Sequence, residues 1–499
     1  MFRNSGLMNL KARDFPKGFT WLNIDKPLSL EALKGQVVLL DFWTYCCINC
    51  MHTLSDLEWI EKKYHGKPFI VIGVHSAKFS NEQDAKNIQE AIRRYEITHP
   101  VIIDRNMTIW QSYNVNGWPT FVIIDPMGNI IYQQSGEGRR EYLDDAISIL
   151  LEQNEKQGTL AKRPLEINRP QIVEPRILSY PGKLSFSPDN KRLAISDSNH
   201  NRILVVDADS GKVIYKIGGG SKGLRDGDFD QALFFRPQGV LWVEDKIYVA
   251  DTENHALREI NLHSRLVKTL VGNGTQGYWI QSPQDGKITQ LSSPWDLAYC
   301  GGLLFIAMAG LHQIWSYHIP TGKIAPFAGN GCEDIVDGSL EEAQFAQPSG
   351  LSIFRNYLFV ADSEISAVRQ IDLNKKIVQT IVGEGLYVFG YKDGFLDEAR
   401  LQHPLGIACE GNKIYIADTY NHAIRLIDLV EQKVLTVIGK PEMTTMCNIN
   451  DPSCDTLGLY EPSDVKISGN HLCIADTNNH LIRIFDLEKR VLKTLPIKE

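Results

Sequence analysis

Two cysteines separated by two residues, Cys47 and Cys50, are the side chains of this sequence best suited to chemistry. A short apolar run at residues 37–40 precedes them. Apolar residues recur every three or four positions through residues 51–64 after them. This pattern places the pair where a buried strand ends and an amphipathic helix begins. The unpaired N–H groups and dipole of a helix N-terminus favour a thiolate, so the position suits a reactive cysteine.

Two other interpretations of the pair are half of a zinc site and two inert core cysteines. A zinc site needs two further ligands close by. The chain contains no second Cys-x-x-Cys and no His-x-x-x-His. A Cys-x-x-Cys beside a strand–helix–strand pattern is typical of a thioredoxin-like redox pair. We therefore expect redox chemistry at Cys47 and Cys50, and we expect no metal.

The segments around the pair predict an α/β domain over residues 1–155. Apolar runs predict strands at residues 69–75, 101–103, 120–125 and 130–134, and helical periodicity predicts helices at residues 81–95 and 139–151. Strand–helix–strand–helix followed by a hairpin and a last helix is the thioredoxin order. The fold prediction therefore does not depend on the cysteines. A polar segment with three prolines predicts a linker over residues 156–176.

Residues 41–50 resemble the active-site segment of thioredoxin-like proteins. The resemblance implies that Cys47 is the attacking cysteine and Cys50 the resolving one. It also implies that Asp41 is the buried acid that handles the proton and that Trp43 is the tryptophan beside the site.

A second segment carries the same resemblance. Gly117-Trp118-Pro119-Thr120 matches the thioredoxin-like loop whose proline is cis and faces the disulfide. The resemblance therefore adds Pro119, with Trp118 beside it, to the expected site.

The active-site segment departs from the usual thioredoxin pattern in two ways. Ile48-Asn49 replaces Gly-Pro between the cysteines, and Cys46 adds a third thiol. Adjacent cysteines rarely form a disulfide with each other because the intervening peptide strains the bridge. We expect Cys46 to point away from Cys50 and to be a regulatory or packing thiol.

From about residue 180 the chain repeats itself with a period of 54 to 58 residues. The clearest copies lie at residues 247–258, 414–425 and 472–483, and weaker copies begin at residues 193, 304 and 358. Each unit predicts four short strands. Six such units predict an all-β six-bladed propeller over residues 177–499. The Ala-Asp-Thr-x-Asn-His-x-Ile-Arg pattern of the clear copies resembles NHL repeats.

The repeats also explain a glycine-rich segment. Residues 272–277 fit the dinucleotide motif Gly-x-Gly-x-x-Gly, but similar glycine pairs recur at residues 329–331 and 383–385. We interpret these glycines as a recurring feature of the repeat, and we expect no cofactor.

Histidines occupy one equivalent position in four of the repeats. A metal-binding or catalytic role is one interpretation. Equivalent turns in different blades are spread around a ring, however, so we expect the histidines to hold turns instead. The repeated aspartates and arginines, such as Asp251 and Arg258, are expected to pair within each blade. The histidines are His255, His312, His422 and His480.

Asp-Gly pairs recur between the blades, at Asp226, Asp337 and Asp393. These connections are long for a propeller. We expect one face to carry a thick layer of loops, which is where recognition commonly occurs.

The charge is uneven along the chain. Residues 1–165 hold 19 basic and 19 acidic residues, whereas the remainder holds 33 basic and 41 acidic residues. This excess of negative charge disfavours nucleic acid as a partner. No apolar run has the length of a signal peptide or a membrane span, so we expect a cytoplasmic, monomeric protein that does not bind membranes. In a reducing cytosol Cys447 and Cys454 are expected to be free thiols, with a disulfide as the alternative.

The combination of a thioredoxin-like segment with six NHL-type repeats resembles the NHL repeat-containing protein 2 family over nearly the whole chain. Two functions fit this resemblance. One is a thiol–disulfide oxidoreductase whose propeller selects a protein client or redox partner. The alternative is a non-enzymatic scaffold that docks partners on the propeller and the thioredoxin-like surface. The cysteine pair with Asp41 and Pro119 favours the oxidoreductase.

Overall fold

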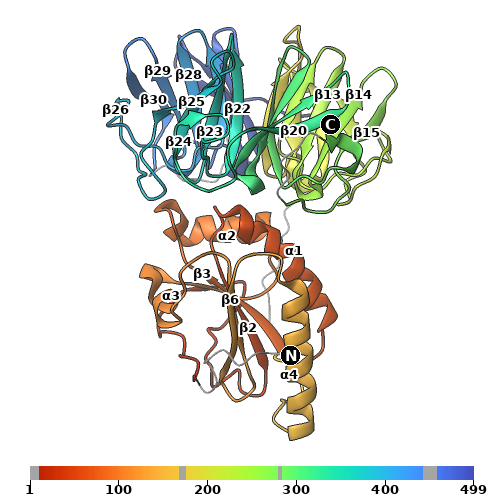
Figure 1. Ribbon diagram of the computed structural model, residues 1–499, viewed down its shortest axis with the longest axis vertical. Helices are drawn as coiled ribbons and strands as arrows, with labels where there is room; N and C mark the ends of the chain where they lie inside the picture. The colour runs from red at the N-terminus through yellow and green to blue at the C-terminus, as the bar shows by residue number, and fades with distance from the viewer. Residues whose placement is uncertain (1–9, 168–175, 279–283, 442–457, 499) are drawn as a thin grey trace. The chain divides into compact units, whose positions relative to one another are not determined.

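The computed structural model describes residues 10–167, 176–278, 284–441 and 458–498. The chain divides into two compact units, Met1–Glu174 and Pro175–Glu499. The first is an α/β thioredoxin-like unit and the second is a six-bladed β-propeller, which confirms the predicted fold class (Figure 1). No helix in the described part of the chain is both long and apolar enough to span a membrane.

The first unit is built on a six-stranded sheet with the order β1-β4-β3-β2-β5-β6. Strands β2, β3 and β4 are parallel, whereas β5 is antiparallel to β2 and β6 is antiparallel to β5. The strands are β1 (Trp21–Leu22), β2 (Val37–Trp43), β3 (Phe69–His75), β4 (Val101–Ile103), β5 (Thr120–Ile124) and β6 (Ile130–Ser135). The helices are α1 (Ile48–Lys63), α2 (Ala85–Arg94), α3 (Thr108–Ser112) and α4 (Arg140–Gln157).

Alternate side chains of β2 are buried on opposite faces of this sheet. Val37 and Leu39 pack with residues of α1 and α4, whereas Val38, Leu40 and Phe42 pack with the side that includes α3. A strand that is apolar on both faces belongs at the centre of a covered sheet. The same alternation directs Asp41 to the face covered by α1 and α4.

The end of the first unit differs from the predicted helix and linker. Helix α4 continues to Gln157, beyond the predicted end at Leu151, and ends at Gly158 with a left-handed backbone. Leu165 and Ile167 then pack against the core of the first unit. Part of the segment predicted as a linker therefore belongs to the thioredoxin-like unit, and the domain boundaries stay predictions.

The second unit contains six sheets of four or five antiparallel strands. The first three are β7 (Pro181–Phe186), β8 (Arg192–Asp197), β9 (Arg202–Asp207), β10 (Val213–Ile217); β11 (Gly227–Asp228), β12 (Val240–Val243), β13 (Lys246–Asp251), β14 (Ala256–Asn261), β15 (Leu266–Val271); and β16 (Gln284–Asp285), β17 (Pro294–Cys300), β18 (Leu303–Met308), β19 (Gln313–His318), β20 (Lys323–Ala328). The last three are β21 (Gly338–Ser339), β22 (Pro348–Phe354), β23 (Tyr357–Asp362), β24 (Ala367–Asp372), β25 (Ile377–Val382); β26 (Gly394–Phe395), β27 (Gly406–Glu410), β28 (Lys413–Asp418), β29 (Ala423–Asp428), β30 (Lys433–Gly439); and β31 (Asp464–Ser468), β32 (His471–Asp476), β33 (Leu481–Asp486), β34 (Val491–Thr494).

The C-terminal segment closes the ring of blades. Lys498 exchanges backbone hydrogen bonds with Gly211 and Val213 at the edge of the first blade, at 3.0 and 2.9 Å. Leu495 and Ile497 pack in a core formed by the first and last blades. Burial of these apolar side chains fastens the end of the chain to its beginning.

The repeated histidines join neighbouring blades, which confirms their structural role. Each has a left-handed backbone, and its Nδ1 accepts a backbone N–H from the start of the next blade. The N–H of Tyr180 in the first blade donates to His480 in the last at 3.0 Å, so this contact also closes the ring. The other three pairs are Ser293 to His255, Gln347 to His312 and Glu461 to His422, at 3.0 to 3.1 Å.

The expected ion pairs inside the blades are present. Arg258 donates to Asp251 and Arg425 donates to Asp418, both at 2.7 Å, and all four side chains are buried. Burial raises the pKa of Asp251 to about 6, although the Arg258 charge opposes this shift.

Each of the three Asp-Gly pairs contributes a short strand to its blade, and the expected loop layer stays a prediction. The glycine after Asp226 begins β11, a short fifth strand that pairs with β15 at the outer edge of its blade. The Asp226 carboxylate accepts Thr269 Oγ1 at 2.7 Å and Arg258 Nη2 at 3.1 Å. These bonds hold the segment in the sheet. The same arrangement recurs at Asp337 and Asp393.

Candidate functional site

Cys47 and Cys50 lie at the junction of β2 and α1, as the sequence predicts. Cys47 is the N-cap of α1, and its Sγ accepts the backbone N–H of Cys50 at 3.4 Å. Cys47 is partly exposed, whereas Cys50 is buried. Burial raises the pKa of the Cys50 thiol well above its ordinary value, and Cys47 and Asp41 add to this shift. The two thiols therefore differ in access, and burial disfavours the thiolate form of Cys50.

Asp41 is fully buried on β2 beneath the start of α1. Neither carboxylate oxygen has a hydrogen-bond partner within the described part of the chain. Burial raises the pKa of Asp41 to about 7, and the charge of His99 acts in the opposite direction. A carboxyl group with such a pKa gains and loses protons near neutral pH, which suits a group that accepts the proton of a neighbouring thiol.

Trp43 ends β2 and is fully buried. Its ring meets the ring of His75 edge-on at a centroid distance of 5.0 Å, and Tyr45 stacks on the same histidine at 5.6 Å. Burial lowers the pKa of His75 to about 3, so this imidazole is neutral at physiological pH. The aromatic residues beside the cysteines are thus packed around an uncharged histidine.

Cys46 lies in a loop that a buried carboxylate holds in place. Glu82 Oε1 accepts the Cys46 N–H at 2.9 Å and the hydroxyl of Thr44 at 2.7 Å. Glu82 Oε2 accepts the backbone N–H groups of Lys78 and Phe79 at 3.1 and 3.0 Å. This one side chain therefore joins the loop before Cys47 to the segment that follows β3.

The fold also brings Pro119 to the same edge of the sheet. Because β5 runs antiparallel to β2, Pro119 before the start of β5 lies at the edge where β2 ends. The Trp118–Pro119 peptide bond is cis, as the resemblance implies. The Trp118 ring packs on Trp110 at 4.6 Å.

Three residues in this region were not predicted from the sequence, namely Glu82, His75 and His99. Each lies on a different segment from the cysteines, and no motif marks it. The position of His75 at the end of an apolar run was the only sequence signal available.

The part of the chain that the structure describes contains no group of three or more His, Cys, Asp or Glu side chains arranged to hold a metal ion. Cys447 and Cys454 lie outside the described residues, so their pairing stays open.

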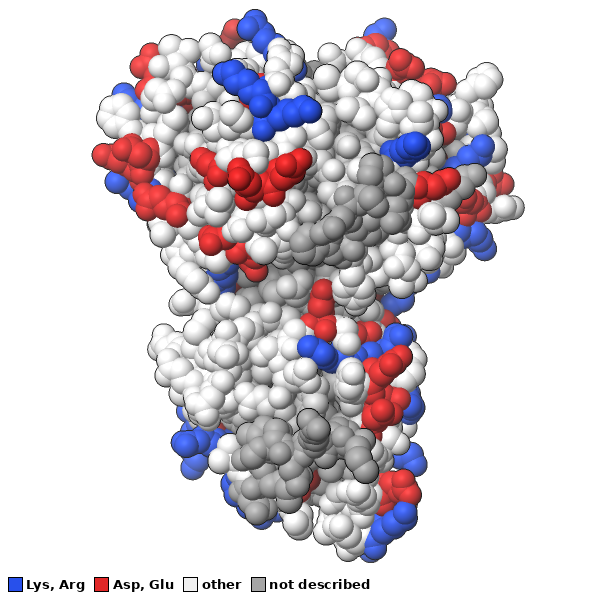
Figure 2. Space-filling view, viewed as in Figure 1, with Lys and Arg blue, Asp and Glu red and all other residues white. Residues whose placement is uncertain are grey.

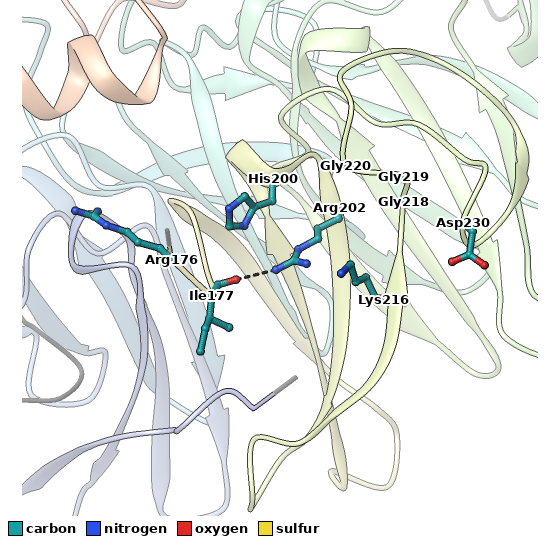
Figure 3. Close-up of a pocket in the computed structure, with 9 residues that line it drawn as sticks. All are labelled: Arg176, Ile177, His200, Arg202, Lys216, Gly218, Gly219, Gly220 and Asp230. Atoms are coloured by element: carbon teal, nitrogen blue, oxygen red, sulfur yellow. Dashed lines mark hydrogen bonds between the residues drawn. The ribbon is translucent and has the colours of Figure 1, made fainter. Parts of the chain in front are cut away.

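A separate recess lies at the edge of the first blade (Figure 3). Its volume is about 690 Å³, and Arg176 and Lys216 contribute positive charge to its lining. Arg202 donates to the Ile177 carbonyl and to the buried Asp197, both at 2.7 Å, so its charge is already compensated. The recess contains no thiol and lies outside the predicted site.

The chain combines a thioredoxin-like unit, which has a cysteine pair at the start of a helix, with a propeller of NHL type. This combination defines a class of two-part proteins. The thioredoxin-like family model matches residues 35–130, and the NHL repeat model matches residues 459–485. The chain is 39% identical to human NHL repeat-containing protein 2 over 525 residues, which cover 98% of this chain and 72% of that protein. The chain belongs to the NHL repeat-containing protein 2 family.

Two further relatives match different shares of the chain. Protein SUPPRESSOR OF QUENCHING 1, chloroplastic, of Arabidopsis thaliana is 44% identical over 495 residues, which cover 95% of this chain and 46% of that protein. The chain thus spans less than half the length of this plant relative. Thiol-disulfide oxidoreductase ResA of Bacillus cereus is 28% identical over 119 residues, which cover 24% of this chain and 66% of that protein.

Proposed function

We propose that the chain is a thiol–disulfide oxidoreductase that acts on a protein client bound by its propeller. The observation that carries the proposal is the arrangement of Cys47, Cys50 and Asp41. The more exposed thiol caps α1, the second thiol is buried one turn inside the helix, and an ionisable carboxyl group lies beneath it. A scaffold has no need for this combination.

The exchange proceeds in two steps in this proposal. The Cys47 thiolate attacks a client disulfide, which forms a mixed disulfide and releases one client thiolate. Cys50 then attacks the Cys47 sulfur, and its proton passes to Asp41. The Cys47–Cys50 disulfide forms and the second client thiolate leaves, so two electrons pass from the protein to the client.

The propeller is the proposed client-binding part. The 33 basic and 41 acidic residues after residue 165 favour client segments that are neutral or basic. Figure 2 shows acidic side chains gathered in several groups on the visible face of the propeller unit. The monomeric state and the cytoplasmic location stay predictions.

Reduction of insulin by dithiothreitol tests the proposed activity. The full-length chain should accelerate the reduction, and Cys47→Ser should lose this acceleration. Cys332 is an exposed free thiol of the propeller, so Cys332→Ser is the matched control and should retain the activity. Failure of the wild-type chain to exceed the uncatalysed rate, or full activity of Cys47→Ser, contradicts the proposal.

A further inference from the structure

Two aromatic side chains, Trp43 and His99, lie unusually close to the backbone of β3 at Gly73. Gly73 is the register partner of Asp41 on the parallel strand β2. A Cβ on Gly73 would lie 2.8 Å from Trp43 Nε1 and 3.3 Å from His99 Nε2. Neighbouring residues of adjacent strands direct their side chains to the same face, so the Asp41 carboxyl group lies on this side of the sheet as well. The missing side chain at position 73 is what allows the two rings to approach the strand.

Several polar atoms on this side of the sheet lack a hydrogen-bond partner among the described residues. Both Asp41 oxygens, Trp43 Nε1 and His99 Nε2 are buried and have no hydrogen-bond partner among the described residues. Buried polar atoms are bonded in the large majority of cases, and a group of exceptions needs an explanation. Here the exceptions converge on one place, directly beside the acid proposed to serve Cys50.

His99 also has a connection to the surface. Its Nδ1 lies 3.4 Å from Glu61 Oε2 on α1, and Thr98 Oγ1 donates to the same oxygen at 3.1 Å. The His99 side chain is 3% exposed, whereas that of Glu61 is 20% exposed. The two ring nitrogens of His99 therefore face a buried carboxyl group on one side and a carboxylate in contact with solvent on the other.

We propose that His99 is a positioning residue that carries protons between the buried Asp41 and the solvent-facing Glu61. This inference rests on the proposed oxidoreductase function. After Asp41 takes the proton of Cys50, the proton passes to His99 Nε2, and the proton on Nδ1 leaves towards Glu61. Only a proton moves in this step, and Asp41 regains its charge for the next cycle.

Few other ionisable groups face His99 among the described residues. Asp41 approaches from β2 and Glu61 from α1, whereas His75 of β3 lies against the Trp43 ring. The side-chain amide of Asn23 donates to the His99 carbonyl at 2.9 Å, which fixes the backbone without engaging the ring nitrogens. The charge of His99 acts to lower the pKa of Asp41, so the two groups lie close enough to interact electrostatically.

The test uses the full-length, reduced chain with glutathione disulfide as oxidant, from pH 5 to pH 9. His99→Gln removes the titrating ring, and Glu61→Gln removes only the outer acceptor. His65 is an exposed histidine of the same unit, so His65→Gln is the control. We expect formation of the Cys47–Cys50 disulfide at pH 7 to slow roughly tenfold in His99→Gln and less in Glu61→Gln, with the His65→Gln rate unchanged.

A second readout separates proton transfer from a general loss of structure. The NMR titration midpoint of the Asp41 carboxyl group should rise in His99→Gln, because the positive charge that favours the carboxylate is gone. A wild-type chain that does not react contradicts the proposed function itself. An active wild type whose pH profile and Asp41 midpoint are unchanged in His99→Gln contradicts only the relay. If His99→Gln fails to fold, the same comparison with Glu61→Gln decides the result.

Discussion

Glu82 Oε1 accepts the backbone N–H of Cys46 at 2.9 Å, so a buried acid from a separate segment fixes the loop that presents Cys47. The same carboxylate serves three further donors, from Thr44, Lys78 and Phe79. The geometry of the active-site loop therefore depends on a residue 36 positions away in the sequence.

Replacement of Glu82 should destabilise the first unit. Glu82→Ala leaves four donors without their acceptor, three of them buried, and we expect the free energy of unfolding to fall by about 3 kcal/mol. Gln83 is exposed and adjacent, so Gln83→Ala is the control. Chemical denaturation of both variants measures the difference. Equal stability of the two variants would show that the carboxylate is not needed to hold the loop.

The thiols should differ in their rates of alkylation. Iodoacetamide at pH 7 should modify Cys47 before Cys50 or Cys46, because Cys46 and Cys50 are 2% and 1% exposed. Peptide mapping by mass spectrometry gives the order, with the exposed Cys332 as an internal reference. Faster labelling of Cys50 than of Cys47 contradicts the assignment of the attacking thiol.

Cys46 should be dispensable for exchange. Its Sγ lies 3.9 Å from Thr44 Oγ1 in a buried site, and the loop is held through its backbone N–H. Cys46→Ser keeps this N–H, so we expect insulin reduction within about twofold of the wild-type rate. A folded Cys46→Ser protein without activity would make Cys46 part of the exchange mechanism.

Asp41→Asn should stabilise the chain at high pH. Burial raises the pKa of Asp41 to about 7, above the value of roughly 4 for an unfolded chain. The folded state therefore binds the proton more tightly, and stability is lost as the pH rises from about 4 through 7. The difference between the folded and unfolded pKa values of Asp41 corresponds to ~4 kcal/mol of stability lost at pH 8. We expect Asp41→Asn to recover about 2 kcal/mol of this loss, because the buried amide also lacks hydrogen-bond partners.

Thermal and urea unfolding from pH 4 to pH 8 measures this effect. The exposed Asp145 provides the control variant Asp145→Asn, which should show no such trend. Near pH 4 the gain from Asp41→Asn should give way to a loss, because the ionisation effect vanishes and the cost of the unpartnered amide remains. A gain of the same size at every pH would mean that ionisation of Asp41 is not its cause.

The sequence predicted long apolar segments well and short irregular ones poorly. Strands β3 and β4 have the bounds predicted, because each is a continuous apolar run. Helix α1 begins at Ile48, before the periodic pattern at residue 51, because Cys47 caps it. Helix α3 was missed, since it has only five residues and follows two residues with left-handed backbone, Asn106 and Met107.

The residues of the candidate site also differ in how well the sequence predicts them. Asp41, Cys47 and Cys50 are neighbours in the sequence, so a motif could reveal them. Glu82 and His99 reach the site through strand register and loop geometry, which no local pattern encodes. The close approach of Trp43 and His99 to Gly73 could not be anticipated either, because a glycine in a strand does not indicate what lies above it.

The central claim is that Cys47 attacks a client disulfide and Cys50 releases it. In the full-length Cys50→Ser protein the second step cannot occur, so incubation with oxidised insulin should yield a stable mixed disulfide. We predict a species whose mass equals protein plus one insulin molecule, linked through Cys47 and removed by dithiothreitol. The Cys47→Ser protein should give none. Absence of the adduct in Cys50→Ser, or its attachment to Cys46 instead of Cys47, contradicts the account.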